Sequence, residues 1–228
     1  MKFKTELLFP TPIWIFEDCP IDNKSIIDFV HEVREEDPKG MKISNEGGWQ
    51  SRDFVMPYVD NTPLGELNQH VTANCYTAAD SFGYRDYNLR LSNMWMNVNT
   101  RGHYNHIHNH PGSIFAGVYY AAVPDCCCGE LKFLRSLQEQ CLKESWGCHE
   151  NFDRYEEQHN YTTWYVQPNP GTMVIFPAWL MHSVDKSATD KERISLSFNI
   201  HCFSDYYRED EIYPKKRGGR KNVPLSLK

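Results

Sequence analysis

The stretch that decides the fold is residues 103–123, HYNHIHNHPGSIFAGVYYAAV. Its first part, residues 103–110, contains four histidines, and its last part, residues 114–123, is apolar and aromatic. Pro111 and Gly112 separate the two parts, and both residue types favour turns. A turn between two β-prone runs predicts a strand on each side of it.

Short β-prone runs continue on both sides of this stretch, separated by Gly- and Pro-containing turns. They cover residues 89–99, 130–134, 163–167, 172–176, 180–184 and 193–201. Many short strands with such turns are typical of a jelly roll or a sandwich. The second half of the chain is therefore predicted to be mostly β.

The first half predicts two helices that pack on the outside of this β scaffold. Asp22 or Asn23 can cap the first helix, which ends before Pro38. Thr62 is a suitable N-cap for the second, with Pro63 at the first helical position. The apolar stripe of the second helix consists of Leu64, Leu67, Val71, Cys75, Ala78 and Phe82. Residues 7–16 are β-prone but contain prolines, which predicts an edge strand or an extended segment.

The 228 residues are predicted to form one β domain over residues 1–204. Residues 135–161 lie between two predicted strands and are polar, so they are interpreted as an inserted loop or lid. Residues 205–228 form a charged C-terminal tail that we expect to be solvated. Its basic residues leave binding to nucleic acid as a weaker alternative.

The net charge of −6 gives no general electrostatic reason to bind nucleic acid or an anionic membrane. The N-terminal apolar run is broken by Pro10 and Pro12, so no signal peptide or membrane span is expected, and the location is predicted to be cytoplasmic. The eight cysteines, three of them at positions 126–128, are then expected to be reduced thiols. A zinc site that combines this run with Cys141, Cys148 and His149 remains an alternative.

The histidine cluster predicts a metal site. On a strand, His106, His108 and His110 would share one face, so either the pair 106 and 108 or the pair 108 and 110 could bind one ion. His182, in the β-prone run FPAWLMHSV, is the candidate for a third ligand. Three ligands on one side leave open positions on the metal, which is typical of a catalytic site rather than a structural zinc site.

Arg193 follows His182 by eleven residues and is followed by Ile194 and Ser195. Strand alternation puts Arg193 and Ser195 on one face, where a guanidinium and a hydroxyl can bind the same carboxylate. This pair is interpreted as an anchor for a dicarboxylate co-substrate.

Three separated motifs resemble one known family. They are YNHIHNHPGSIFAGVYY, NPGTMVIFPAWLMHSV and ERISLSFN, supported by LFPTPIW and GGWQS nearer the start. Together they are similar to the 2-oxoglutarate/Fe(II)-dependent oxygenases of bacteria and marine phages, a group related to prolyl hydroxylases. The similarity covers most of residues 7–200.

This resemblance implies a mostly β double-stranded β-helix (jelly roll) with two supporting N-terminal helices. It also implies that Fe(II) is bound by His108, His110 and His182, and that Arg193 and Ser195 hold the distal carboxylate of 2-oxoglutarate. By analogy with related hydroxylases, Tyr120 would donate a further hydrogen bond to that carboxylate.

The chain departs from the wider superfamily at His110, where Asp or Glu is usual. A neutral imidazole in place of a carboxylate leaves the full charge of the divalent ion uncompensated. The choice between His106 and His110 stays open, although the Pro111–Ser113 segment ends the strand where the family motif does and favours His110.

The predicted function is an iron(II) dioxygenase that uses O2 and 2-oxoglutarate, hydroxylates a peptidyl or small-molecule substrate, and releases succinate and CO2. Trp49, Gln50 and Asn97 are candidates for the side facing the primary substrate, whose identity the sequence does not give. Two alternatives remain: a three-histidine, cupin-like dioxygenase without 2-oxoglutarate, and a non-catalytic metal-binding module.

Overall fold

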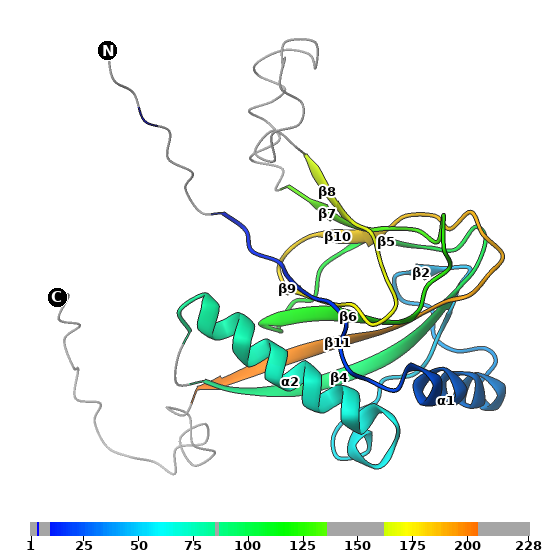
Figure 1. Ribbon diagram of the computed structural model, residues 1–228, viewed down its shortest axis with the longest axis horizontal. Helices are drawn as coiled ribbons and strands as arrows, with labels where there is room; N and C mark the ends of the chain where they lie inside the picture. The colour runs from blue at the N-terminus through cyan, green and yellow to red at the C-terminus, as the bar shows by residue number, and fades with distance from the viewer. Residues whose placement is uncertain (1–3, 5–9, 85–86, 136–161, 205–228) are drawn as a thin grey trace, which may run out of the picture.

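The computed structural model describes residues 4, 10–84, 87–135 and 162–204. Two antiparallel β-sheets form most of this part, with two helices beside them (Figure 1). The helical elements are α1 (Asn23–Glu36), the 3-10 turn η1 (Val59–Asn61) and α2 (Leu64–Ser81). The strands are β1 (Trp14–Phe16), β2 (Asn45–Glu46), β3 (Trp49–Gln50), β4 (Tyr87–Asn99), β5 (Tyr104–His108), β6 (Phe115–Ala122), β7 (Leu131–Leu134), β8 (Thr163–Val166), β9 (Met173–Pro177), β10 (His182–Val184) and β11 (Arg193–Ser204).

The strand order identifies a jelly roll. One sheet has the order β1-β9-β6-β11-β4-β3 and the other β2-β5-β10-β7-β8. From β4 onward the chain crosses between the sheets at almost every connection, and only β7 and β8 follow each other in one sheet. The predicted double-stranded β-helix is therefore confirmed.

Two apolar clusters stabilise this arrangement. In the larger one, α1 and α2 pack against the six-stranded sheet through residues such as Ile26 and Leu67, both almost completely buried. The smaller cluster lies between the sheets and joins residues of β6 and β9 to residues of β7 and β8. Figure 1 shows both helices on the side of the six-stranded sheet away from the other sheet. The space between the sheets is thus lined by side chains of both.

The cap predicted for the first helix is confirmed, whereas the N-cap of α2 is Pro63 rather than Thr62. Asp22 Oδ1 accepts hydrogen bonds from the backbone N–H groups of Lys24 and Ser25, at 3.1 and 3.2 Å. Thr62 Oγ1 accepts from Leu64 N at 3.2 Å, although the helix proper begins one residue after Pro63. Phe82 was wrongly included in the buried stripe: α2 ends at Ser81, so Phe82 no longer faces the core and is 52% exposed.

Other predicted segments differ in extent or lie outside the described residues. The edge strand predicted within residues 7–16 is confirmed as β1, which pairs only with β9. The strand with the histidines ends at His108, so His110 lies beyond it rather than on it. Residues 136–161 of the predicted insert and the tail 205–228 lie outside the described part. Among the described helices, none is long and apolar enough to cross a membrane.

Gly117 in the middle of β6 allows the strands to pack closely. A Cβ atom at this position would lie 2.7 Å from Val174 O and closer still to the ring of Phe198. We expect Gly117→Ala to lower the free energy of unfolding by about 1–3 kcal/mol, because a well-packed core does not accommodate an added methyl group. Urea unfolding measures this, with Thr77→Ala on the exposed face of α2 as the control expected within about 0.5 kcal/mol of wild type. Equal stability of the two variants would contradict the packing.

Candidate metal centre and co-substrate pocket

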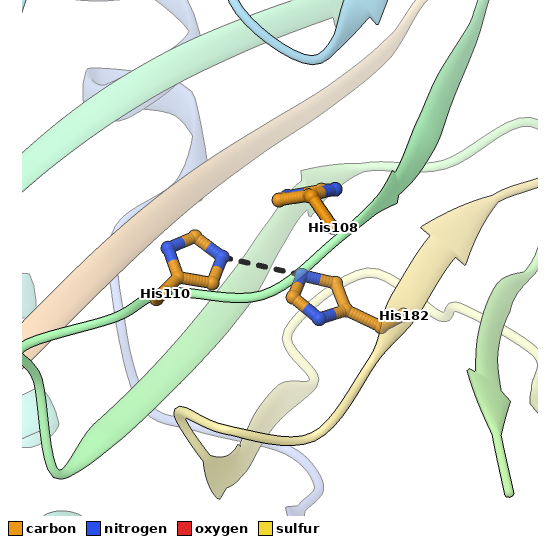
Figure 2. Close-up of side chains that lie close together, drawn as sticks. All are labelled: His108, His110 and His182. Carbon is orange, nitrogen blue, oxygen red and sulfur yellow. Dashed lines mark hydrogen bonds between the residues drawn. The ribbon is translucent and has the colours of Figure 1, made fainter. Parts of the chain in front are cut away.

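Three histidines converge at one end of the five-stranded sheet. His108 is the last residue of β5 and His182 the first of β10, and the two are direct partners in the antiparallel register. His110 follows β5 by two residues, and its backbone N–H donates to Ala178 O at 2.9 Å, which fixes the chain beside the β9–β10 turn. Figure 2 shows the three imidazoles around a common space.

The ring nitrogens have the spacing of a metal site. The Nε2 atoms of His110 and His182 are 3.2 Å apart, and one ligand atom from each of the three residues lies within 4.8 Å of the others. Two nitrogens that bind one ion at about 2.1 Å and at right angles are about 3 Å apart. Small side-chain movements are therefore enough for three-point coordination.

Backbone carbonyls set the tautomers of two of these rings. His108 Nδ1 lies 2.7 Å from His106 O, and His182 Nδ1 lies 3.0 Å from Leu180 O. A carbonyl oxygen only accepts hydrogen bonds, so each Nδ1 carries the proton and each Nε2 keeps a lone pair for the cluster. In the neutral, metal-free cluster His110 Nε2 then donates to His182 Nε2; to bind a metal ion through Nε2 as a neutral ligand, His110 would carry its proton on Nδ1 instead. The donor set fits a divalent transition metal.

The environment keeps the three rings neutral, which metal binding requires. Burial, together with the neighbouring His108 and His110, lowers the pKa of His182 to about 3. Burial also lowers the pKa of His110 to about 4, with a contribution from His108, and burial lowers the pKa of His108.

The remaining histidines of the 103–110 stretch lie elsewhere. The side chain of His106 is exposed, with Nε2 3.7 Å from Glu46 Oε2. His103 Nδ1 accepts a hydrogen bond from Thr100 N at 2.9 Å. Of the two pairs that the sequence left open, the structure brings together His108 and His110.

One cavity between the sheets is lined by the histidine cluster and by all three predicted co-substrate residues. They are Arg193 and Ser195 at the start of β11 and Tyr120 on β6, which is the register partner of Ser195. The cavity therefore connects a candidate metal site on one sheet with a cationic group on the other.

Arg193 is the most unusual residue in this cavity because it is 2% exposed. Its Nη1 donates to the carbonyl oxygens of Cys128 and Gly129, at 3.0 and 2.7 Å. Its Nε is buried without a hydrogen-bond partner, and no ion pair among the described residues includes it. A buried guanidinium without a carboxylate is costly, so an anionic ligand is the natural partner.

Tyr120 is placed to add a neutral donor. It is 2% exposed, and burial raises the pKa of its phenol to about 12, although the neighbouring Arg193 lowers it. The phenol therefore stays protonated at neutral pH and can donate a hydrogen bond.

The candidates for the substrate side separate into two groups. Asn97 lines the cavity and donates to Ser197 Oγ at 3.2 Å. Trp49 and Gln50 are buried on β3 and are not among the cavity residues; the indole N–H of Trp49 donates to Asp37 O at 2.8 Å. Trp95 lines the cavity and stacks on His110 at a ring-centroid distance of 5.8 Å.

Phe176 also belongs to the site, although no sequence pattern singled it out: its ring centroid lies 4.7 Å from that of His182, and it lines the same cavity. Its position in a continuous apolar run gave no signal, because such a run predicts a buried strand without indicating which residue meets the site.

Comparisons with known proteins agree with this geometry. Residues 93–199 match the model of a family described as "Putative 2OG-Fe(II) oxygenase". This match, over a little less than half of the chain, and the three-histidine cluster indicate an oxygenase that depends on iron(II) and 2-oxoglutarate, with 2-oxoglutarate and O2 as its co-substrates. The matched segment includes every metal and co-substrate candidate named above, from His108 to Ser195.

Solved structures share the fold at low sequence identity. A Pseudomonas putida prolyl-4-hydroxylase aligns with a TM-score of 0.52 and 12% identity, covering 84% of this chain and 92% of that one. A Trichoplax adhaerens prolyl hydroxylase in complex with a peptide fragment of hypoxia inducible factor aligns with a TM-score of 0.58 and 9% identity, covering 90% of this chain and 87% of that one. HygX from Streptomyces hygroscopicus, with nickel and 2-oxoglutarate bound, aligns with a TM-score of 0.52 and 11% identity, covering 84% of this chain and 83% of that one. No curated protein sequence matches the chain.

Removal of one imidazole should abolish metal binding. We expect His182→Ala to lose the stoichiometric binding of Fe(II), or of Co(II) as a stable substitute, because two ligands no longer cap the ion. Anaerobic calorimetry measures the stoichiometry. His106→Ala is the matched control and should bind one ion per chain as wild type does. Loss of binding in His106→Ala but not in His182→Ala would reverse the assignment.

The metal-free protein should lose stability in acid. Because folding lowers the pKa values of His110 and His182 to about 4 and about 3, the unfolded chain takes up protons first as the pH falls below about 6.5. The contribution of these two histidines to the free energy of unfolding is thus complete above about pH 6.5. It declines as the pH falls from there towards and through their folded-state pKa values. Urea unfolding of chelator-treated protein at pH 7 and pH 5 should show this decline, and a flatter one in the His110→Gln/His182→Gln double variant. The same pH slope in both proteins would contradict it.

Proposed function

We propose that this oxygenase is a hydroxylase in which His108, His110 and His182 hold iron(II), while Arg193, Ser195 and Tyr120 bind the distal carboxylate of 2-oxoglutarate. The observation that carries the proposal is Arg193, a buried cation with an unpartnered Nε in the cavity that the histidines line. A dicarboxylate supplies the missing anion at one end and two metal-binding oxygens at the other.

The charges of the site support a dianionic co-substrate. Three neutral imidazoles leave the two positive charges of the ion uncompensated, and Arg193 adds one more. The protonated phenol of Tyr120 and the hydroxyl of Ser195 can donate to a carboxylate without adding charge. Binding of a dianion would thus offset two of these three positive charges.

The chain's own contribution is to bind, orient and exclude water. Arg193 and Ser195 fix one end of the co-substrate, and the aromatic rings of Trp95 and Phe176 shield the cavity beside His110 and His182. With its cofactors bound, the site supplies oxidation of a substrate C–H bond coupled to conversion of 2-oxoglutarate to succinate and CO2. Asn97, which also lines the cavity, is proposed to contact the primary substrate.

The proposed primary substrate is a peptidyl side chain or a small molecule. Both the Pseudomonas putida and the Trichoplax adhaerens neighbours are prolyl hydroxylases, the latter in complex with a peptide fragment, and HygX has also been solved with hygromycin B bound. Both substrate types therefore occur on this fold. We further propose a cytoplasmic location, supported by the free thiols of all six described cysteines.

Turnover separates this function from its two rivals. Incubation of the protein with Fe(II), ascorbate and 2-oxoglutarate should release succinate, and candidate substrates should increase the rate. A three-histidine dioxygenase without 2-oxoglutarate would consume O2 with a substrate but form no succinate. A non-catalytic metal-binding module would do neither.

Arg193→Lys should raise the KM for 2-oxoglutarate about tenfold or more, because lysine keeps the charge but cannot donate a planar pair of hydrogen bonds. Succinate release at varied 2-oxoglutarate gives the KM. Arg101→Lys, which changes an exposed arginine paired with Asp190, is the control and should leave the KM unchanged. An unaltered KM in Arg193→Lys would remove the proposed anchor.

A further inference from the structure

Three consecutive cysteines lie in the turn between β6 and β7. Cys126 and Cys127 are exposed, Cys128 is 1% exposed, and all three are free thiols. Neither the metal centre nor the proposed co-substrate site uses these thiols, yet Arg193 donates to the backbone of the same turn.

The two exposed thiols are on adjacent residues of this turn. The neighbouring Cys126 thiol is the main reason why the pKa of Cys127 is raised. Cys127 also has a positive φ of 58°, which residues with a side chain rarely adopt. The turn therefore presents two accessible thiols on adjacent residues, one of them in an unusual backbone conformation.

The backbone that follows these thiols supports Arg193. Cys127 O accepts from Ala188 N at 2.7 Å, and the next two carbonyls, of Cys128 and Gly129, accept from Arg193 Nη1. Gly129 has a φ of +84°, and a Cβ there would lie 3.2 Å from Arg193 Nη1. A change in the torsion angles at Cys126 or Cys127 thus acts directly on an acceptor of the guanidinium.

We propose that Cys126 and Cys127 form an oxidation-sensitive dithiol, and that their conversion to a disulfide weakens 2-oxoglutarate binding by moving the Cys128 carbonyl away from Arg193. This inference rests on the proposed role of Arg193. The modification closes a small ring that contains the peptide bond between the two residues, and Cys128 is excluded as a partner by its burial.

The oxidant class is a peroxide, and hydrogen peroxide balances the reaction. One thiolate attacks the peroxide, which breaks the O–O bond and leaves a sulfenic acid and one water after protonation. The second thiol displaces the hydroxyl group from that sulfur, so an S–S bond forms and a second water leaves. Two thiols are oxidised by two electrons, and one peroxide is reduced.

Such a bond suits a reversible modification rather than a structural one. Adjacent Cα atoms are about 3.8 Å apart, below the roughly 4.4–6.8 Å that unstrained disulfides prefer. Strained and exposed disulfides have oxidising potentials and are reduced easily. A thiol reductant should therefore restore the dithiol form.

The test uses the 228-residue chain loaded with Mn(II), so that the metal itself is not oxidised by peroxide. After treatment with hydrogen peroxide, peptide mapping by mass spectrometry should show a link between Cys126 and Cys127. Calorimetry should show a Kd for 2-oxoglutarate about tenfold higher than in the reduced protein, the effect of losing one hydrogen bond to a charged group. Dithiothreitol should restore the original Kd.

Two variants serve as controls. Cys126→Ser/Cys127→Ser should bind 2-oxoglutarate like the reduced wild type and should not respond to peroxide. Cys202→Ser, which removes a half-buried thiol on β11, should respond like wild type.

Two results would overturn the inference alone: absence of the Cys126–Cys127 link in peroxide-treated protein, or formation of the link without a change in Kd. Failure of the reduced protein to bind 2-oxoglutarate would instead overturn the proposed function. The proposed effect of the disulfide on 2-oxoglutarate binding would then fall with it. Because the link is mapped independently of binding, these failures are distinguishable.

Discussion

The antiparallel pairing of β5 with β10 is the interaction on which the site depends. It places His108 directly opposite His182, although 74 positions separate them in the chain. Strand pairing fixes neighbouring chains about 4.8 Å apart, which brings the two rings within reach of one ion. His110 joins them because its backbone is bonded to the turn that leads into β10.

The second constraint is a charge buried between the sheets. Arg193 begins β11 in the six-stranded sheet, whereas the histidine pair belongs to the five-stranded sheet, so the cavity exists only when the sheets are packed together. The carbonyls of Cys128 and Gly129 satisfy part of the guanidinium and leave Nε unpartnered. The fold thus retains an electrostatic cost that a bound anion can remove, as is common at ligand sites.

In the proposed metal centre, His110 would stand where a carboxylate is usual, which would give this site its own electrostatic character. A facial set of three neutral ligands stabilises the charge of a divalent ion less than two histidines and one carboxylate do. The imidazole of His110 stacks on Trp95 of β4, so its orientation is supported by the six-stranded sheet as well as by the loop after β5. The charge of the co-substrate would therefore affect the stability of the bound ion, and the packing of the six-stranded sheet against His110 would affect the orientation of a ligand.

The sequence alone predicted the strand-rich second half, the Asp22 cap of the first helix and the residue types of the site, because these depend on local periodicity, capping and chemical function. The choice between the pair His106/His108 and the pair His108/His110 came from the tertiary structure. Strand alternation treats the two pairs alike, and β5 ends before His110. The tertiary structure also placed Trp49 in the core, brought Phe176 to His182, and joined the cysteine turn to Arg193. These are contacts between segments far apart in the chain, and they follow from how the two sheets pack rather than from any local pattern.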